Sequence, residues 1–237
     1  MAEPWRLLVF GATGAIGSSV VDHARAAGWQ AVAVSRSNAP RPDFDGVAWL
    51  RYDPLSDPGN ALAGQRPFDA VCFAQGANMA DSVKAFDAGA HLDLYRANCL
   101  SVVAGCAALL RERLLRAGGA RIAVVSSIWQ ERARADKLSY TMTKAAIGGF
   151  VRSASVDLGA EGHLVNGVLP GVLDTPMTRA NLSPDQIARV CGKTSAGRLP
   201  DLSTLAETIL FLCSERNTSI SGQSVTVDLG MSNAHLL

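Results

Sequence analysis

The sequence is poor in the residues that build metal sites and disulfide frameworks. Its five cysteines are an odd number and none stands in a C-x-x-C pair, which argues against a disulfide framework and a structural zinc site. The four histidines are scattered without metal-ligand spacing, so no metal site is predicted. Only four of the 22 basic residues are lysines. The net charge of +1 gives no reason to expect a nucleic acid or an anionic membrane as partner.

Long apolar runs and targeting signals are also lacking. No run is expected to reach the length of a membrane span, and the first ten residues lack the basic and apolar regions of a signal peptide. A cytoplasmic protein is therefore expected. A chain of 237 residues with 48% hydrophobic and 18% charged residues is typical of a globular protein. We expect one domain over residues 1–237.

Short apolar segments alternate with helix-like segments. The predicted strands are 5–10, 30–35, 47–52, 69–74, 121–126, 163–169 and 224–228, and the main predicted helices are 18–27, 91–116, 138–159 and 202–214. This alternation predicts an α/β fold of the Rossmann-like, doubly wound kind, with a seven-stranded parallel sheet and helices on both faces. Residues 174–200 contain one weak helical piece, 184–190, and are expected to form a substrate lid at the carboxyl edge of the sheet.

A glycine-rich turn joins the first predicted strand to the first predicted helix. It reads Gly11-Ala12-Thr13-Gly14-Ala15-Ile16-Gly17. Glycines allow a tight turn and a close approach to phosphate, and the N–H groups of a helix N-terminus attract it. A plain tight turn is the alternative, but the flanking strands and helix favour a dinucleotide site.

The end of the second predicted strand bears on the choice of cofactor. It carries Ser35 and Arg36 and has no carboxylate to bind a ribose 2′-hydroxyl. Because arginine offers charged donors to a 2′-phosphate, NADP(H) is predicted in preference to NAD(H). The alternative is that Arg36 is only a solvated loop charge.

One segment carries a candidate reaction centre. Tyr140 and Lys144 are four residues apart, so on a helix they share one face, and Ser127 precedes the tyrosine by thirteen residues. An ammonium group beside a phenol is expected to lower the pKa of the phenol. Ser127 would then bind a carbonyl oxygen while Tyr140 gives or takes a proton. Taken alone, this spacing is also compatible with an ordinary amphipathic helix.

In combination, these motifs resemble the short-chain dehydrogenase/reductase family in its single-domain branch, particularly 3-oxoacyl-carrier-protein reductase-like members. The matches run in order along the chain: the 11–17 loop, Asp53, Gly76, Asn98, Ser127, Tyr140, Lys144, Pro170-Gly171, Thr175-Pro176-Met177 and the 220–231 tail.

The resemblance implies roles for individual residues. Tyr140 would be the acid/base, Lys144 would bind the nicotinamide ribose, and Ser127 would polarise the carbonyl. Asn98 would hold a helix kink and a water molecule; its alternative is to satisfy local backbone. The implied cofactor-binding set is Gly11, Thr13, Gly14, Ala15, Ile16, Gly17, Ser35, Arg36, Asp53, Ala74, Gly76, Tyr140, Lys144, Pro170, Gly171, Val172 and Thr175.

The chain departs from the family pattern in two places. Phe10 replaces a threonine and the loop reads GxxGxxG, which also occurs in regulatory relatives. The usual Asn-Ala-Gly after the fourth strand becomes Ala74-Gln75-Gly76, which puts local rigidity in doubt.

The substrate is less visible in the sequence. Trp129, Gln130, Leu173 and Met177 are predicted to line its pocket. The implied reaction interconverts a small oxo compound and its secondary alcohol, and the family suggests a homodimer or homotetramer. Two alternatives stay open, namely a non-catalytic dinucleotide sensor or scaffold and a sugar-modifying epimerase or dehydratase.

Overall fold

All seven strands lie parallel in one sheet, in the order β3-β2-β1-β4-β5-β6-β7. The computed structural model describes residues 3–36, 46–57, 59–175, 178–179 and 182–233. The strands are β1 (Arg6–Phe10), β2 (Gln30–Ser35), β3 (Ala48–Arg51), β4 (Ala70–Phe73), β5 (Arg121–Val125), β6 (Leu164–Pro170) and β7 (Ser224–Val227). The predicted doubly wound α/β fold is confirmed, and the predicted strand ends differ from the observed ones by about one residue.

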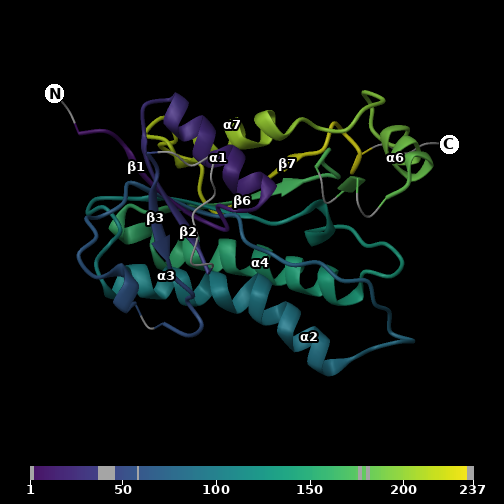
Figure 1. Cartoon of the computed structure of the whole chain (residues 1–237), viewed down its shortest axis with the longest axis horizontal. Coiled ribbons are helices and arrows are strands. Elements are labelled where there is room, and N and C mark those ends of the chain that lie inside the picture. Colours follow the sequence, from purple (N-terminus) through teal and green to yellow (C-terminus); the bar gives the residue numbers. More distant parts are fainter. Residues whose placement is uncertain (1–2, 37–45, 58, 176–177, 180–181, 234–237) are drawn as a thin grey trace.

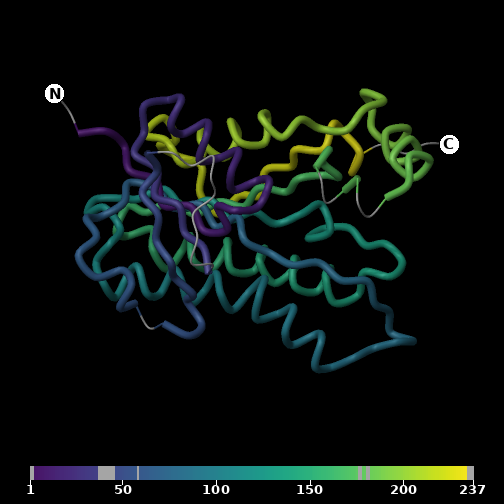
Figure 2. The backbone as a smooth tube through the Cα atoms, in the orientation of Figure 1, coloured from purple at the N-terminus to yellow at the C-terminus, as the bar shows by residue number. Residues whose placement is uncertain are grey.

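Helices cover both faces of the sheet (Figure 1). The long helices are α1 (Ala15–Ala26), α2 (Ala88–Tyr95), α3 (Ser101–Arg111), α4 (Leu138–Asp157), α6 (Pro184–Cys191) and α7 (Leu202–Cys213). The tube in Figure 2 shows α1 and α7 on one side of the sheet and α2, α3 and α4 on the other. The sheet is therefore the middle of three layers.

Alternation along β1 shows why the core divides in two. Leu7 and Val9 pack in the cluster that includes residues of α1 and α7, whereas Leu8 and Phe10 pack in the cluster that includes residues of α3 and α4. Successive side chains of a strand point to opposite faces, so a strand buried on both sides is apolar throughout. The short sequence Arg6–Phe10 fits this position because all five of its residues are buried.

The helical stretch 88–111 differs from its prediction. A continuous helix over 91–116 was expected, but the chain forms α2, a π-helical segment Arg96–Leu100 (η2) and then α3, which ends at Arg111. By length and composition alone, the helical stretch Ala88–Arg111 is long and apolar enough to cross a membrane. Half of its most apolar window is buried inside the protein, as in the core helix of a globular fold.

From β1 the chain first adds β2 and β3 on one side and then β4 to β7 on the other. The strand order therefore reverses between β1 and β4, which pair in parallel. Ligands of open α/β sheets bind outside the carboxyl ends of the strands at such a switch point. The segments that follow β1, β4, β5 and β6 are therefore the ones that can build a site.

Candidate active site

Two of the three glycines in the loop after β1 have no room for a Cβ. Gly11 has φ +70°, and a Cβ there would lie 2.6 Å from the backbone N of Gln75. A Cβ on Gly17 would lie 2.3 Å from the Gly11 carbonyl oxygen. Gly14 is the N-cap of α1 and offers no side chain to cap it. The N–H groups of the first turn of α1 thus stay available to an anion.

The ends of β2 and β3 lie beside this loop. Ala12 donates a backbone hydrogen bond to Val34 (3.3 Å), and the carbonyl of Ser35 accepts one from Tyr52 (3.0 Å). Arg36 is exposed. The Asp53 carboxylate accepts a hydrogen bond from the backbone N of Leu55 (3.0 Å), so part of its capacity is used in a local turn.

Gln75 stands at the alanine position of the usual Asn-Ala-Gly in the turn after β4, and one end of its side chain lacks a hydrogen bond. Its Nε2 lies 3.5 Å from Ser101 Oγ, whereas its buried Oε1 has no hydrogen-bond partner among the described residues. The backbone of the preceding residue, Ala74, is nevertheless paired with Phe10 across the sheet (3.0 Å).

Asn98 joins the turn after β4 to α4 by hydrogen bonds. Its Oδ1 accepts a hydrogen bond from Ala77 N (2.7 Å), and its Nδ2 donates to Ala77 O (3.0 Å) and Thr143 Oγ1 (3.0 Å). The side chain is 1% exposed and belongs to η2. Asn98 therefore pairs with the backbone of Ala77, 21 residues earlier in the chain, from a π-helical segment, and it ties the turn after β4 to α4. Such segments are frequent at functional sites.

Ser127, Tyr140 and Lys144 converge at the carboxyl end of β5. Ser127 follows β5 and caps a 3-10 turn, Ile128–Gln130 (η3), by accepting a hydrogen bond from Trp129 N (3.3 Å). Its side chain also pairs with that of Tyr140. The Lys144 Nζ lies 5.6 Å from the centroid of the Tyr140 ring and donates to the Val125 carbonyl (3.2 Å). A Cβ on Gly76 would lie 3.6 Å from that same Nζ.

Burial dominates the titration of this group. It raises the pKa of Tyr140, and the hydrogen bond with Ser127 opposes the rise. Burial also lowers the pKa of Lys144 to about 8. Burial is thus the largest cause of the shift at both groups, and the expected lowering of the Tyr140 pKa by Lys144 stays a prediction.

The segment after β6 closes the site on another side. Pro170 ends β6, and a Cβ on Gly171 would lie 2.8 Å from the Cβ of Asp228. The Thr175 hydroxyl lies 3.1 Å from that of Thr178 and accepts a hydrogen bond from its backbone N. This use of Thr175 is a local turn at the start of the expected lid.

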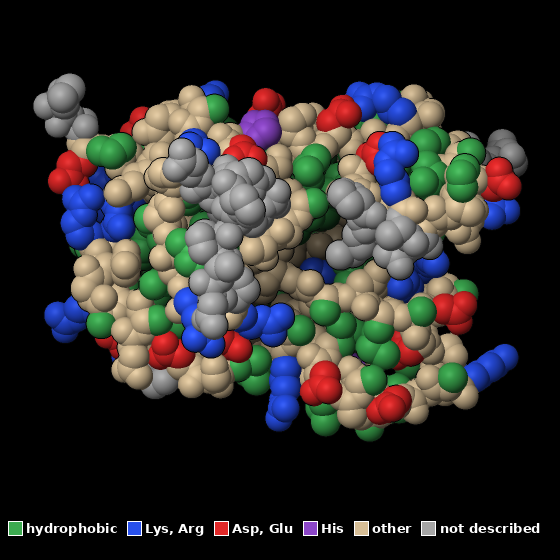
Figure 3. Space-filling view, viewed as in Figure 1, with side chains coloured by type: hydrophobic (Ala, Val, Ile, Leu, Met, Phe, Trp, Pro, Cys, Tyr) green, Lys and Arg blue, Asp and Glu red, His purple; other side chains and the backbone are tan. Residues whose placement is uncertain are grey.

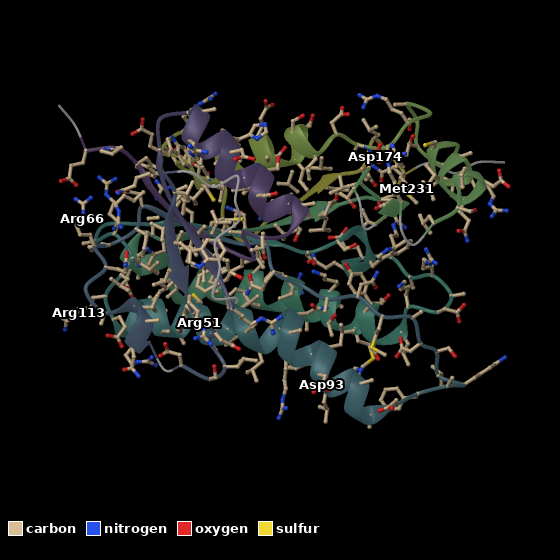
Figure 4. The ribbon with its side chains drawn as sticks, viewed as in Figure 1. Arg51, Arg66, Asp93, Arg113, Asp174 and Met231 are labelled. Carbon is tan, nitrogen blue, oxygen red and sulfur yellow. The ribbon has the colours of Figure 1, made fainter. Side chains whose placement is uncertain are left out.

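A cavity of about 310 Å³ opens next to η3. Its wall comes from four separate segments and consists of Trp129, Arg134, Ala135, Asp136, Val172, Val190, Lys193 and Met231. Met231 and Asp174 lie at the α6 end of the molecule (Figure 4). The face in Figure 3 is hollowed near its centre, with Lys and Arg side chains beside the hollow.

Only one of the described residues predicted to line the substrate pocket lies in the wall of this cavity. Trp129 lines the cavity. Gln130 does not, because its Nε2 donates to Ser224 Oγ (2.9 Å) and its side chain packs over Gly148. Leu173 is buried in the core cluster shared with α1 and α7. Met177 lies outside the described residues.

Several residues of the site were missed from the sequence. Val190 and Lys193 reach the cavity from the expected lid, residues 174–200, and Met231 reaches it from the 220–231 tail, but none of the three was predicted to line the pocket. A second unpredicted feature is a polar cluster at the start of α4. The Asp81 carboxylate accepts hydrogen bonds from the backbone N (3.0 Å) and the hydroxyl of Ser139, and that hydroxyl also pairs with His91 Nδ1 (2.8 Å). This cluster anchors the residue that precedes Tyr140.

Comparison with known proteins agrees with this architecture. Residues 68–232 match the family described as enoyl-(acyl carrier protein) reductase. L-xylulose reductase of Bos taurus is 32% identical over 242 residues, which cover 95% of both chains. The 3-oxoacyl-[acyl-carrier-protein] reductase FabG of Salmonella typhimurium is 33% identical over 139 residues. That match covers 59% of this chain and 56% of the relative, so the chain spans about half of its length.

A solved structure extends the likeness to the whole fold. The gluconate 5-dehydrogenase of Burkholderia cenocepacia, in complex with NADP and tartrate, has a TM-score of 0.89 at 24% identity, covering 99% of this chain and 97% of that one. This likeness shows that the two chains share the doubly wound α/β fold. The chain belongs to the short-chain dehydrogenase/reductase family.

Proposed function

We propose that this protein is an NADP(H)-dependent oxidoreductase that interconverts a carbonyl and a secondary alcohol, with Tyr140 as general acid/base. The observation that carries the proposal is the convergence of Ser127, Tyr140 and Lys144 beside Gly76, at the edge of the sheet that also holds the glycine loop. The family binds nicotinamide dinucleotides, and the loop fits one because it turns tightly at Gly11 and Gly17, where a Cβ has no room, and exposes the start of α1 at Gly14.

The dinucleotide, when bound, supplies the hydride chemistry, while the chain supplies position and a proton. The Ser127 hydroxyl donates a hydrogen bond to the carbonyl oxygen and orients it. Tyr140 gives its proton to the developing alkoxide. A pKa raised by burial keeps this phenol protonated at neutral pH, as an acid must be. Lys144, anchored on the Val125 carbonyl, holds its ammonium group near the same ring.

Substitution of Tyr140 by phenylalanine tests the mechanism. Tyr140→Phe removes the proton donor and keeps the ring, so we expect turnover of oxo compounds with NADPH to fall at least about 10²-fold. Affinity for NADPH, measured by calorimetry, should change little. Tyr95→Phe, on an exposed tyrosine, is the matched control. Unchanged turnover in Tyr140→Phe would contradict the mechanism and favour the sensor or scaffold alternative.

The cofactor preference rests on Arg36. This side chain is exposed at the end of β2, next to the loop that would hold the pyrophosphate, where its guanidinium can meet a 2′-phosphate. Arg36→Ala should weaken NADPH binding about tenfold and leave NADH binding near its wild-type value. A wild-type preference for NADH would refute this preference.

The remaining assignments follow from the same arrangement. Residues 174–200 would serve as the substrate lid, which is supported by the presence of Val190 and Lys193 in the cavity wall. The partner would be a small oxo or hydroxy compound in the cytoplasm. Exposed apolar side chains on α2, α3 and α4 support a homodimer or homotetramer, for which the mass in solution is the test; they include Leu92, Val103, Met142 and Val156.

A further inference from the structure

The cavity next to η3 combines an apolar wall with an excess of positive charge. Trp129, which lies two residues after Ser127, and the remote Val172, Val190 and Met231 supply the apolar part. The three charged residues of the wall are Arg134, Asp136 and Lys193. The volume of about 310 Å³ is at the lower end of the range for ligand pockets, so the cavity suits a small molecule.

The two cations approach the cavity from different segments and are not engaged with the protein. Arg134 lies in the loop between η3 and α4, and Lys193 lies two residues after the end of α6. Within the described ranges, neither side chain forms an ion pair or a hydrogen bond to a protein group. The Lys193 backbone N does pair with Val190 O. Asp136 is likewise unpaired among these residues, so the wall carries one net positive charge.

A third cation adds to the positive potential near this wall. The Lys137 Nζ lies 5.8 Å from the centroid of the Tyr140 ring, where it donates to Asn78 Oδ1 (2.8 Å) and Met79 O (2.9 Å). Burial and, next in size, the charge of Arg134 lower the pKa of Lys137. The charge of Arg134 thus acts on Lys137, a neighbour of the Tyr140 ring.

We propose that this cavity selects carbonyl substrates that bear an anionic group, a carboxylate or a phosphate, and that Arg134 and Lys193 bind that group. The proposal rests on the function proposed above, which puts the carbonyl at Ser127 and Tyr140. A short apolar body then packs against Trp129 and Val172, and the anion lies between two cations that have no other partner. A neutral ketone gains the apolar contacts but leaves both cations dependent on water.

Matched substrate pairs test the selectivity of the holoenzyme. The carboxylate arm compares acetoacetate with methyl acetoacetate, and the phosphate arm compares dihydroxyacetone phosphate with dihydroxyacetone, each followed at the nicotinamide absorbance with NADPH. We expect kcat/KM to favour the anion about tenfold or more in at least one arm, since a hydrogen bond to a charged group is worth about that factor. The arm that shows the preference identifies the anion.

Charge variants locate the origin of the preference. Arg134→Gln with Lys193→Gln should reduce the ratio of kcat/KM between anion and neutral partner about tenfold, mainly through KM. Asp136→Asn should increase the ratio, because it removes the only negative charge of the wall. Arg132→Gln is the control in the same loop, since Arg132 does not line the cavity. Added salt should reduce the ratio in the wild type.

A binding measurement separates this proposal from the proposed function. Acetoacetate and dihydroxyacetone phosphate are titrated by calorimetry into the wild type and the double variant, both in the presence of NADP⁺. If the wild type binds an anion and the double variant does not, the anion site is supported. If in addition no oxo compound is reduced, only the proposed function is refuted. Equal kcat/KM for anion and neutral partner in both arms, or absence of binding by either anion, overturns the anion site.

Discussion

Replacement of Lys144 by methionine should stabilise the folded protein at neutral pH. Lys144 is 4% exposed, its ammonium group donates one hydrogen bond, to Val125 O, and burial lowers its pKa from 10.5 to about 8. Below pH 8 the folded and unfolded states both carry the proton, so the full cost of burying the charge is present. That cost is about 3 kcal/mol, because each pKa unit corresponds to about 1.4 kcal/mol. A methionine of similar length avoids it.

The same reasoning predicts the sign of a pH dependence. Between pH 8 and 10.5 the unfolded state holds the lysine proton that the folded state has released, so the Lys144 contribution to the free energy of unfolding rises with pH. From pH 7 to pH 9.5 the rise should be about 2 kcal/mol. Burial raises the pKa of four thiols, and above the ordinary thiol pKa these groups make the free energy of unfolding fall with pH. The wild type and Lys144→Met both contain them: Cys72, Cys99, Cys106 and Cys213.

Urea unfolding at several pH values measures this contribution. The free energy of unfolding of the wild type minus that of Lys144→Met cancels the terms of Cys72, Cys106 and Cys213, on which Lys144 does not act, and should rise with pH by the amount above. Lys84→Met, on an exposed lysine, should give a difference that does not change with pH. A difference for Lys144→Met that stays flat or falls between pH 7 and 9.5 would refute the reasoning. Reductase activity should be lost at every pH.

Two further changes test how the site is held. Asn98→Ala removes three hydrogen bonds, one of them to Thr143, and should cost about 3 kcal/mol, lowering Tm by about 6–12 °C in a thermal melt; a loss below about 1 kcal/mol would count against the bridging role. Gly17→Ala puts a Cβ 2.3 Å from the Gly11 carbonyl and should cost about 1–3 kcal/mol in urea unfolding and weaken NADPH binding. In contrast, Gly149→Ala, with open space around it in α4, should stabilise by about 1 kcal/mol, and equal effects at the two glycines would refute the packing argument.

The doubly wound fold was predictable because its signals are local. Apolar runs about five residues long, such as Leu7–Phe10 within β1, can be buried on both sides only in a parallel sheet covered by helices. The glycine loop directly follows such a strand, and the family's ordered motifs place the rest. The family resemblance implied a helix kink at Asn98, but the π-helical form of that segment was not predictable, since it depends on contacts with Ala77 and Thr143 made across the fold.

The pocket shows where local reasoning stops. Gln130 and Trp129 are neighbours in sequence and were both expected to face the substrate, but η3 points Gln130 toward Ser224 and Trp129 toward the cavity. Leu173 was expected there because it follows β6, yet it packs in the core, while Val172 lines the cavity. In both pairs, neighbouring side chains along a turn point in different directions. Which of the two faces the cavity depends on packing that the sequence pattern does not encode.

By itself, the sequence determined the fold class, the glycine loop and the spacing of Ser127, Tyr140 and Lys144, because strand alternation, turn chemistry and helix periodicity act over a few residues. Only the tertiary structure decided how these groups titrate and what surrounds them. Burial sets the pKa of Tyr140 and Lys144, and burial is a property of the whole packed chain. The joining of Arg134 and Lys193 in one cavity wall likewise requires the segments after β5 and α6 to meet in space.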